Sequence, residues 1–191
     1  MLQRLGFPSV GRHRRFVTAI GIDAVGSGVF MPISMLYFLV ATDLTLVQVG
    51  AAISLASLVS LPAGPLLGSV VDRVGAKPVL LAGNVLQGVG FVAFLFADSF
   101  LAVTFWIVVA TIGRTAFWGS YGPIVASISV PGERELWFGF LGALRNVGFA
   151  IGGLVSGIAI TIGTETAYAA VAIANAASYG VALVLLLGMP A

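Results

Sequence analysis

The sequence predicts an all-α integral membrane protein with six transmembrane helices. Three observations predict this fold class: a low content of charged residues, a series of long apolar stretches, and cations placed on one side of those stretches. Of the 191 residues, 59% are hydrophobic and 8% are charged, and the mean hydropathy is +1.11. A soluble domain carries roughly 25% charged residues. We therefore expect the chain to fold in a lipid bilayer.

About 20 apolar residues are needed for a helix to cross the hydrocarbon core. Six such stretches can be drawn, with short polar segments between them: residues 16–41, 47–71, 78–97, 100–127, 138–162 and 167–188. The first stretch follows a basic arm, residues 1–15, as the core of a signal peptide would. Its length exceeds the roughly 7 to 15 residues of a signal-peptide core. We therefore expect it to be a membrane helix.

The cations predict the orientation of the helices, because Lys and Arg gather on the cytoplasmic side of membrane proteins. Seven cations lie before the first span, after the second or after the fourth: Arg4, Arg12, Arg14, Arg15, Arg73, Lys77 and Arg134. The charged residues in the loops on the other side are all acidic: Asp43, Asp98 and Glu165. We expect both termini in the cytoplasm and the protein in the plasma (inner) membrane. Its basic residues are then expected to meet membrane lipid and not nucleic acid.

The residue types present exclude most catalytic chemistry. Cysteine is absent and His13 is the single histidine, so the sequence offers no cluster of metal ligands and no motif for a cofactor. Gly119, Ser120 and Gly122 resemble the Gly-Ser-x-Gly of a rhomboid intramembrane protease. A serine nucleophile needs a base within hydrogen-bond reach, and His13 precedes the first span. We therefore expect no enzyme activity, no metal and no cofactor.

A charged turn, GSVVDRVGAKPVLL, separates the second and third spans. Glycine permits a chain reversal there, and proline suits the first turn of the next helix. Five residues fit the pattern G-x-x-x-D-R-x-G-x-[RK]-[RK], in which the last basic position is here a proline: Gly68, Asp72, Arg73, Gly75 and Lys77. This segment resembles the signature loop of the major facilitator superfamily, which lies between the second and third membrane helices.

The resemblance implies a carrier of two six-helix halves, each built from two inverted three-helix repeats. The chain would be the N-terminal half. The family implies secondary active transport of a small-molecule substrate, coupled to a proton or another cation, with the signature loop taking part in conformational switching. In the family, the acidic residue of this loop meets the opposite half. We therefore expect a second six-helix half or a second copy of the chain as partner.

Internal symmetry gives some support to the two repeats. A shift of 91 residues lays the first span on the fourth and matches glycine, proline and isoleucine: Gly28 with Gly119, Pro32 with Pro123, and Ile33 with Ile124. In the fifth span, Gly148, Gly152 and Gly153 resemble the G-P-x-x-G-G of the family's antiporters, with Phe149 in place of the proline. Small residues let membrane helices approach closely. We expect these three glycines at a packing seam, whereas the missing proline weakens the case for proton exchange.

Asp23 and Arg114 are the ionisable residues expected to line a cavity. A charge at the bilayer centre costs about 2.5 to 3.5 kcal/mol on insertion scales, so it persists where it faces a cavity or a partner. The first and fourth helices both line the central cavity of the family fold. We expect Asp23 and Arg114 to face each other there, either as part of the coupling machinery or as a structural ion pair. Arg145 is expected to extend toward the cytoplasmic interface.

Two functions stay open on the sequence alone. The first is secondary active transport by a carrier of which this chain is an N-terminal half or a truncated form. The second is a non-transporting six-helix membrane protein with a structural or assembly role.

Overall fold

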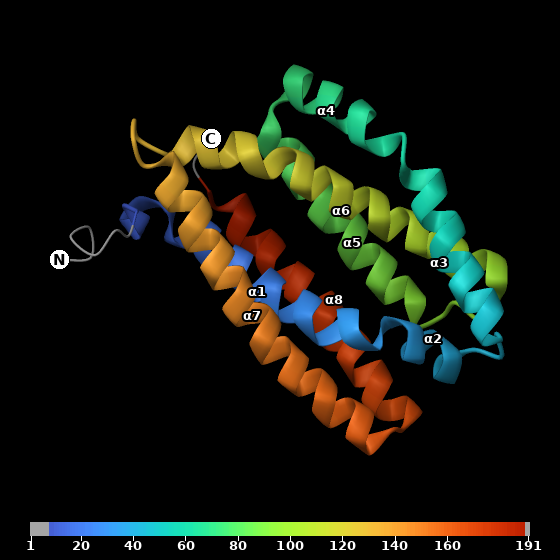
Figure 1. Cartoon of the computed structure of the whole chain (residues 1–191). Coiled ribbons are helices and arrows are strands. Elements are labelled where there is room, and N and C mark those ends of the chain that lie inside the picture. The colour runs from blue at the N-terminus through green and yellow to red at the C-terminus, as the bar shows by residue number, and fades with distance from the viewer. Residues whose placement is uncertain (1–7, 190–191) are drawn as a thin grey trace.

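A computed structural model describes residues 8–189, and this range folds into helices with no strand (Figure 1). The first span is a run of four elements: η2 (Val10–His13), α1 (Arg14–Phe30), η3 (Met31–Ile33) and α2 (Ser34–Ala41). Pro32 lies in η3, and a proline inside a helix removes one backbone donor. The α-helix is therefore interrupted by one tighter turn. Arg14 and Arg15 already belong to α1, although we expected them in the arm.

The second span is divided into α3 (Leu46–Ser60) and α4 (Ala63–Val74), whose axes differ by 44°. Thr45 caps the start of α3 by accepting a hydrogen bond from the backbone N–H of Gln48 at 3.3 Å. Pro62 lies at the break and is the residue before α4. Because proline cannot donate to the helical ladder, the chain bends at this point.

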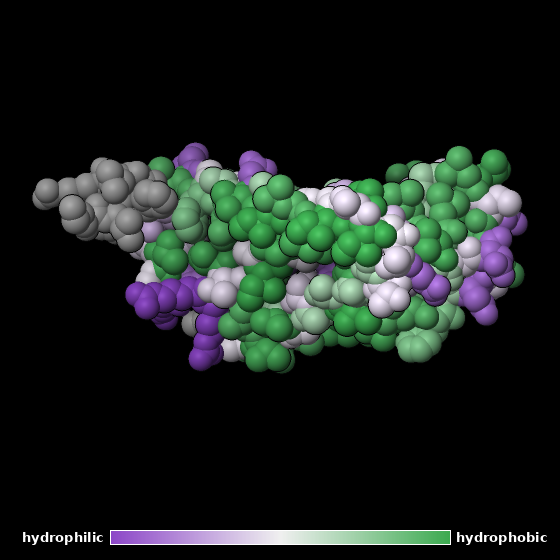
Figure 2. All heavy atoms as spheres, turned by 90° about the horizontal axis from the view of Figure 1, so that it is seen from below, coloured by the Kyte–Doolittle hydropathy of each residue, from purple (hydrophilic) through white to green (hydrophobic). Residues whose placement is uncertain are grey.

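The remaining spans are single helices: α5 (Ala76–Phe94), α6 (Phe100–Ile128), α7 (Arg134–Ile162) and α8 (Glu165–Leu187). In the described residues, five runs are long and apolar enough to cross a membrane, and the bent pair makes a sixth if it counts as one span. Apolar side chains cover much of the face in Figure 2, and hydrophilic ones gather toward its ends. Large exposed side chains such as Leu154, Ile158 and Val184 contribute to the apolar surface. The protein is therefore an integral membrane protein.

The two triplets of spans exchange their first helices. Counting spans in chain order, α1 belongs to the first triplet but packs against α7 and α8 of the second. Conversely, α6 belongs to the second triplet but packs against α3, α4 and α5 of the first. Contact between α5 and α8 joins the two groups, which lie side by side in Figure 1. This interlocking holds the six spans in one bundle.

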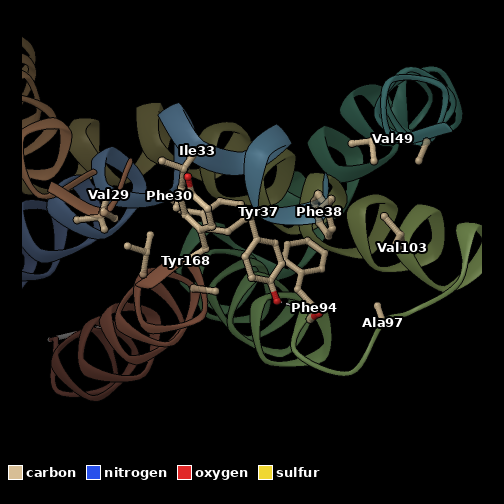
Figure 3. Packing of buried hydrophobic residues seen from close by; sticks show 14 residues of the cluster. Val29, Phe30, Ile33, Tyr37, Phe38, Val49, Phe94, Ala97, Val103 and Tyr168 are labelled. Carbon is tan, nitrogen blue, oxygen red and sulfur yellow. Dashed lines mark hydrogen bonds between the residues drawn. The ribbon is translucent and has the colours of Figure 1, made fainter. Parts of the chain in front are cut away.

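Aromatic residues fill the core near the end of the first span (Figure 3). Phe38 meets Phe94 edge to face with 5.0 Å between ring centroids, and both rings are labelled in Figure 3. Phe30 meets Phe91 in the same way at 4.7 Å. The hydroxyl of Tyr37 donates a hydrogen bond to the carbonyl oxygen of Phe94 at 3.0 Å. This core therefore ties α1 and α2 to α5.

Close backbone approach joins α1 to α7. A Cβ atom at Gly148 would lie 2.7 Å from the Cβ of Ala24, and one at Gly152 would meet the backbone of Val25. Ser156 donates a hydrogen bond to the carbonyl oxygen of a residue of α1, Val29. Gly148 and Gly152, two of the three glycines expected at a packing seam, thus lie at the seam between α1 and α7. The third, Gly153, has open space where its Cβ would be.

Candidate functional site: a cavity lined by all six spans

A cavity of about 570 Å³ lies at the centre of the bundle. Every span contributes to its wall, with these residues among the lining: Asp23, Ser27 and Phe30 of α1; Ile53 and Ser57 of α3; Gln87 and Phe91 of α5; Arg114 and Trp118 of α6; Arg145 and Phe149 of α7; Asn175 and Tyr179 of α8. Ligand sites commonly have volumes of roughly 300 to 1,000 Å³. The cavity can therefore hold a small organic molecule.

The ion pair in this cavity joins Asp23 to Arg145. The Nη1 atom of Arg145 donates to the Oδ2 atom of Asp23 at 3.0 Å, and the two side chains are 12% and 6% exposed. We expected Arg114 as the partner and expected Arg145 to reach the interface, and the structure differs on both points. The glycine seam explains why, since it brings α7 directly against α1.

Three aromatic rings surround the guanidinium of Arg145. Its Cζ atom lies 4.5 Å from the ring centroid of Trp118, 5.7 Å from that of Phe117 and 5.6 Å from that of Phe149. A guanidinium over an aromatic face is attracted by the negative charge of the ring face. Arg145 therefore connects three spans, through Asp23 on α1, the rings of α6 and its own helix α7.

Arg114 also lines the cavity, as expected, but it is exposed there. Among residues 8–189 it has no salt bridge and no hydrogen bond through its side chain. The shift of 91 residues places residue 23 on residue 114, so the acidic and basic residues occupy equivalent positions in the two repeats. They face one cavity, but only the acidic residue has an ionic partner within the described chain.

A chain of hydrogen-bonded polar side chains in the cavity lining connects α1, α8 and α5. The hydroxyl of Tyr179 donates to the Oε1 atom of Gln87 at 3.1 Å, and the hydroxyl of Ser27 lies 3.4 Å from that of Tyr179. Gln87 in turn donates from Nε2 to the carbonyl oxygen of Gly83 at 3.3 Å. Sequence reasoning missed these residues. Their signal is the presence of hydrogen-bonding side chains within apolar spans.

Two buried asparagines have incomplete hydrogen bonding. Asn175 is 0% exposed, lines the cavity, and has no partner for its Nδ2 atom in the described part of the chain. Asn84 is 1% exposed, and neither polar atom of its amide has a partner there. The shift of 91 residues places residue 84 on residue 175. Buried polar groups are ordinarily paired, so these two amides are exceptions, and the Nδ2 atom of Asn175 is itself closed off from the cavity space.

The signature loop lies at the junction of α4 and α5, away from the residues that line the cavity. Gly68 lies within α4, Asp72 and Arg73 lie in its last turn, and Gly75 separates the two helices. Gly75 has φ 90° and ψ 161°, a conformation that is essentially limited to glycine. The side chains of Asp72 and Arg73 are exposed and form no ion pair within residues 8–189.

Lys77 of the loop and Arg15 of α1 both hold the end of α8. The Nζ atom of Lys77 donates to the carbonyl oxygen of Met189, and the Nη1 atom of Arg15 donates to that of Gly188, each at 2.6 Å. Cations near the last carbonyls of a helix are favoured by its dipole. Three spans therefore meet at this corner. Arg4, another residue of the expected cytoplasmic set, lies outside the described residues.

Comparison with known families decides the classification. The sequence profile of the Major Facilitator Superfamily matches residues 16–191. The chain belongs to this superfamily. Its members are membrane transporters and not enzymes, so the predicted fold class and the expectation of no enzyme activity are confirmed. Within residues 8–189, no three His, Asp or Glu side chains are grouped as metal ligands would be.

Resistance proteins are among the relatives of this superfamily member. It is 30% identical over 175 residues to the class G tetracycline resistance protein of Vibrio anguillarum, covering 87% of this chain and 43% of that protein. It is 25% identical to the class B tetracycline resistance protein of Escherichia coli over 83% of this chain and 40% of that protein. The multidrug resistance protein MdtH of Aeromonas hydrophila subsp. hydrophila is 28% identical over 69% of this chain and 33% of that protein. The chain thus spans less than half the length of these relatives.

Proposed function

We propose that this chain is the N-terminal half of a secondary active transporter, or a truncated form of one, which carries a small organic solute through its central cavity. One observation carries the proposal: all six spans line a cavity of about 570 Å³ that holds a buried ion pair. A protein with only a structural or assembly role needs neither feature. The signature-loop residues Gly68, Asp72, Arg73, Gly75 and Lys77 would then serve conformational switching at the junction of α4 and α5.

Coupling to a proton or another cation would act at Asp23. Its carboxylate is held by the guanidinium of Arg145, which also contacts the rings of α6. A proton on Asp23 removes the charge that attracts Arg145, so α1 and α7 lose their ionic link. A ligand can shift a conformational equilibrium only by binding one state better than the other. A cation that replaces the ion pair meets this condition, because it binds Asp23 only when Arg145 has left.

The relatives favour export of an antimicrobial compound as the direction of transport. Their names describe resistance to tetracycline or to many drugs. A transporter in the plasma (inner) membrane would give resistance by lowering the concentration of drug inside the cell. Since the relatives are more than twice as long as the matched segment, we propose that a second six-helix half or a second copy of the chain completes the carrier.

The orientation follows from the basic residues, which we propose to be cytoplasmic. Arg12, Arg14, Arg73, Lys77 and Arg134 flank the cytoplasmic ends of the spans in this arrangement, where they meet anionic lipid. Both termini then lie in the cytoplasm.

The test is an accumulation assay in the cells that carry the gene. Tetracycline fluorescence inside cells should be lower with the intact gene than after its deletion, and a protonophore should abolish the difference. Asp23→Asn should behave as the deletion does. Asp98→Asn is the matched control, because Asp98 is an exposed acid in the loop after α5. Equal accumulation with and without the gene, for tetracycline and for a panel of other antibiotics, would contradict export and favour the assembly role.

A further inference from the structure

Arg114 presents a cation to the cavity. It lines the cavity and offers the N–H groups of an exposed guanidinium. Guanidinium N–H groups cannot accept hydrogen bonds. A molecule that satisfies Arg114 must therefore present acceptor atoms to it.

Two strong acceptors of the cavity are already engaged. The carboxylate of Asp23 accepts from Arg145 at 3.0 Å, and the amide oxygen of Gln87 accepts from Tyr179 at 3.1 Å. The charged residues of the lining are one aspartate and two arginines. With the aspartate paired to one arginine, the charge left without an ionic partner among the described lining residues is the cation of Arg114.

The aromatic rings of the lining suit a flat solute. Phe91 stacks on Tyr179 at 5.5 Å and meets Phe30 edge to face at 4.7 Å, so these rings form one apolar wall. A cationic ligand would be attracted most strongly to the face of a tryptophan and less strongly to that of a tyrosine or phenylalanine. The ring of Trp118 is already covered by the guanidinium of Arg145 at 4.5 Å.

We propose that the cavity selects aromatic solutes that carry an anionic group, with Arg114 holding the anionic oxygen. The inference deepens the proposed function, on which it rests for its place in transport, but binding itself requires no transport. Hydrogen bonds to charged groups contribute roughly 1.5 to 3 kcal/mol each, which corresponds to about a tenfold to hundredfold change in affinity.

Binding of three matched probes to the purified chain in nanodiscs of zwitterionic lipid tests this proposal. The probes are 2-naphthoate, 2-naphthamide and 2-naphthylmethylammonium, which share the ring and differ in charge. Equilibrium dialysis against empty nanodiscs removes the contribution of lipid partitioning. We expect 2-naphthoate to bind at least about tenfold more tightly than either other probe. Fluorescence of Trp118, which lines the cavity, should respond to 2-naphthoate, and Trp118→Phe should remove that response.

Variants show which residues are responsible for the preference for 2-naphthoate. Arg114→Gln should abolish the advantage of 2-naphthoate, and Arg114→Lys should retain part of it because the charge persists. Arg12→Gln is the matched control, because it removes one exposed cation that does not line the cavity.

A preference for the cationic probe, or an unchanged preference for 2-naphthoate in Arg114→Gln, would overturn the proposal. The outcome is distinct from that of the accumulation assay. Loss of anion preference with intact drug export would leave the transporter and remove only this selectivity. Anion preference without any export would leave the binding site and remove the transport function.

Discussion

The guanidinium of Arg145 lies 3.0 Å from the carboxylate of Asp23 and 4.5 Å from the ring centroid of Trp118. A single side chain therefore joins α1, α6 and α7 at the wall of the cavity. Arg114 lines the same cavity without an ionic partner in the described residues. The two arginines thus have different environments, one compensated and one not, and this difference separates the expected behaviour of their variants.

A double-mutant cycle should find coupling between Asp23 and Arg145. Breaking a buried pair on one side leaves an uncompensated charge and costs about 3 to 5 kcal/mol. Asp23→Asn and Arg145→Gln should each lower the stability measured by thermal unfolding in detergent, and the double variant should lose less than their sum. In the matching cycle of Asp23→Asn with Arg114→Gln, the losses of stability should be close to additive. Coupling of Asp23 to Arg114, with additivity toward Arg145, would show that the pairing observed here is wrong.

Two neighbouring glycines of α7 should differ sharply in their tolerance of alanine. A Cβ at Gly152 would collide with the backbone of α1, whereas one at Gly153 meets nothing within 4 Å. Overpacking typically costs about 1 to 3 kcal/mol, so Gly152→Ala should lower the unfolding temperature or the yield of folded protein. Gly153→Ala should leave both unchanged or raise them slightly, since glycine lowers helix stability. Equal effects would mean that α1 and α7 do not approach this closely.

The sequence predicted the helices because their signal is local. Apolar stretches of sufficient length and the Gly-Asp-Arg-Gly pattern of the loop are properties of consecutive residues. The break of the second span also has a local cause in Pro62, which leaves α3 and α4 at 44° to each other. The fold class and the position of the signature loop could therefore be derived without a structure.

The partner of Asp23 could not be derived in this way. Arg114 and Arg145 are both cations in apolar spans, and the choice between them depends on which helix packs directly on α1. Gly148 and Gly152 decide this through a contact with α1 that sequence spacing does not specify. The same holds for Tyr179 and Gln87, whose hydrogen bond joins residues 92 positions apart.

The topology can be tested with reporter fusions. Alkaline phosphatase folds only outside the cytoplasm, so a fusion after Ala191 should be inactive, and one after Asp98, in the loop between α5 and α6, should be active. The reason is that loops and termini rich in Lys and Arg are retained on the cytoplasmic side of the membrane. High activity after Ala191 with low activity after Asp98 would invert the proposed orientation.

Gly75 should be the most demanding position of the signature loop for stability. Its φ of 90° and ψ of 161° are essentially accessible to glycine alone. Gly75→Val should therefore lower the stability of the chain by about 1 to 3 kcal/mol and impair transport by the completed carrier, while membrane insertion persists. In the stability assay, Gly68→Ala is the matched control, because Gly68 is helical and a Cβ there meets nothing within 4 Å. A stable Gly75→Val variant would show that the chain reverses differently at this junction.

Asp72 should matter for transport and not for the stability of this chain. It is exposed in the last turn of α4, where the helix dipole disfavours a carboxylate by about 0.3 to 1 kcal/mol. Its side chain has no ionic partner among residues 8–189, so Asp72→Asn should leave the unfolding temperature unchanged or slightly higher. The same variant should slow export by the assembled carrier, where the carboxylate would meet a helix terminus of the opposite half. Asp43→Asn, on an exposed loop before α3, is the control. If Asp72→Asn instead destabilises the chain, or exports as fast as the control, this loop does not act as a switch between the two halves.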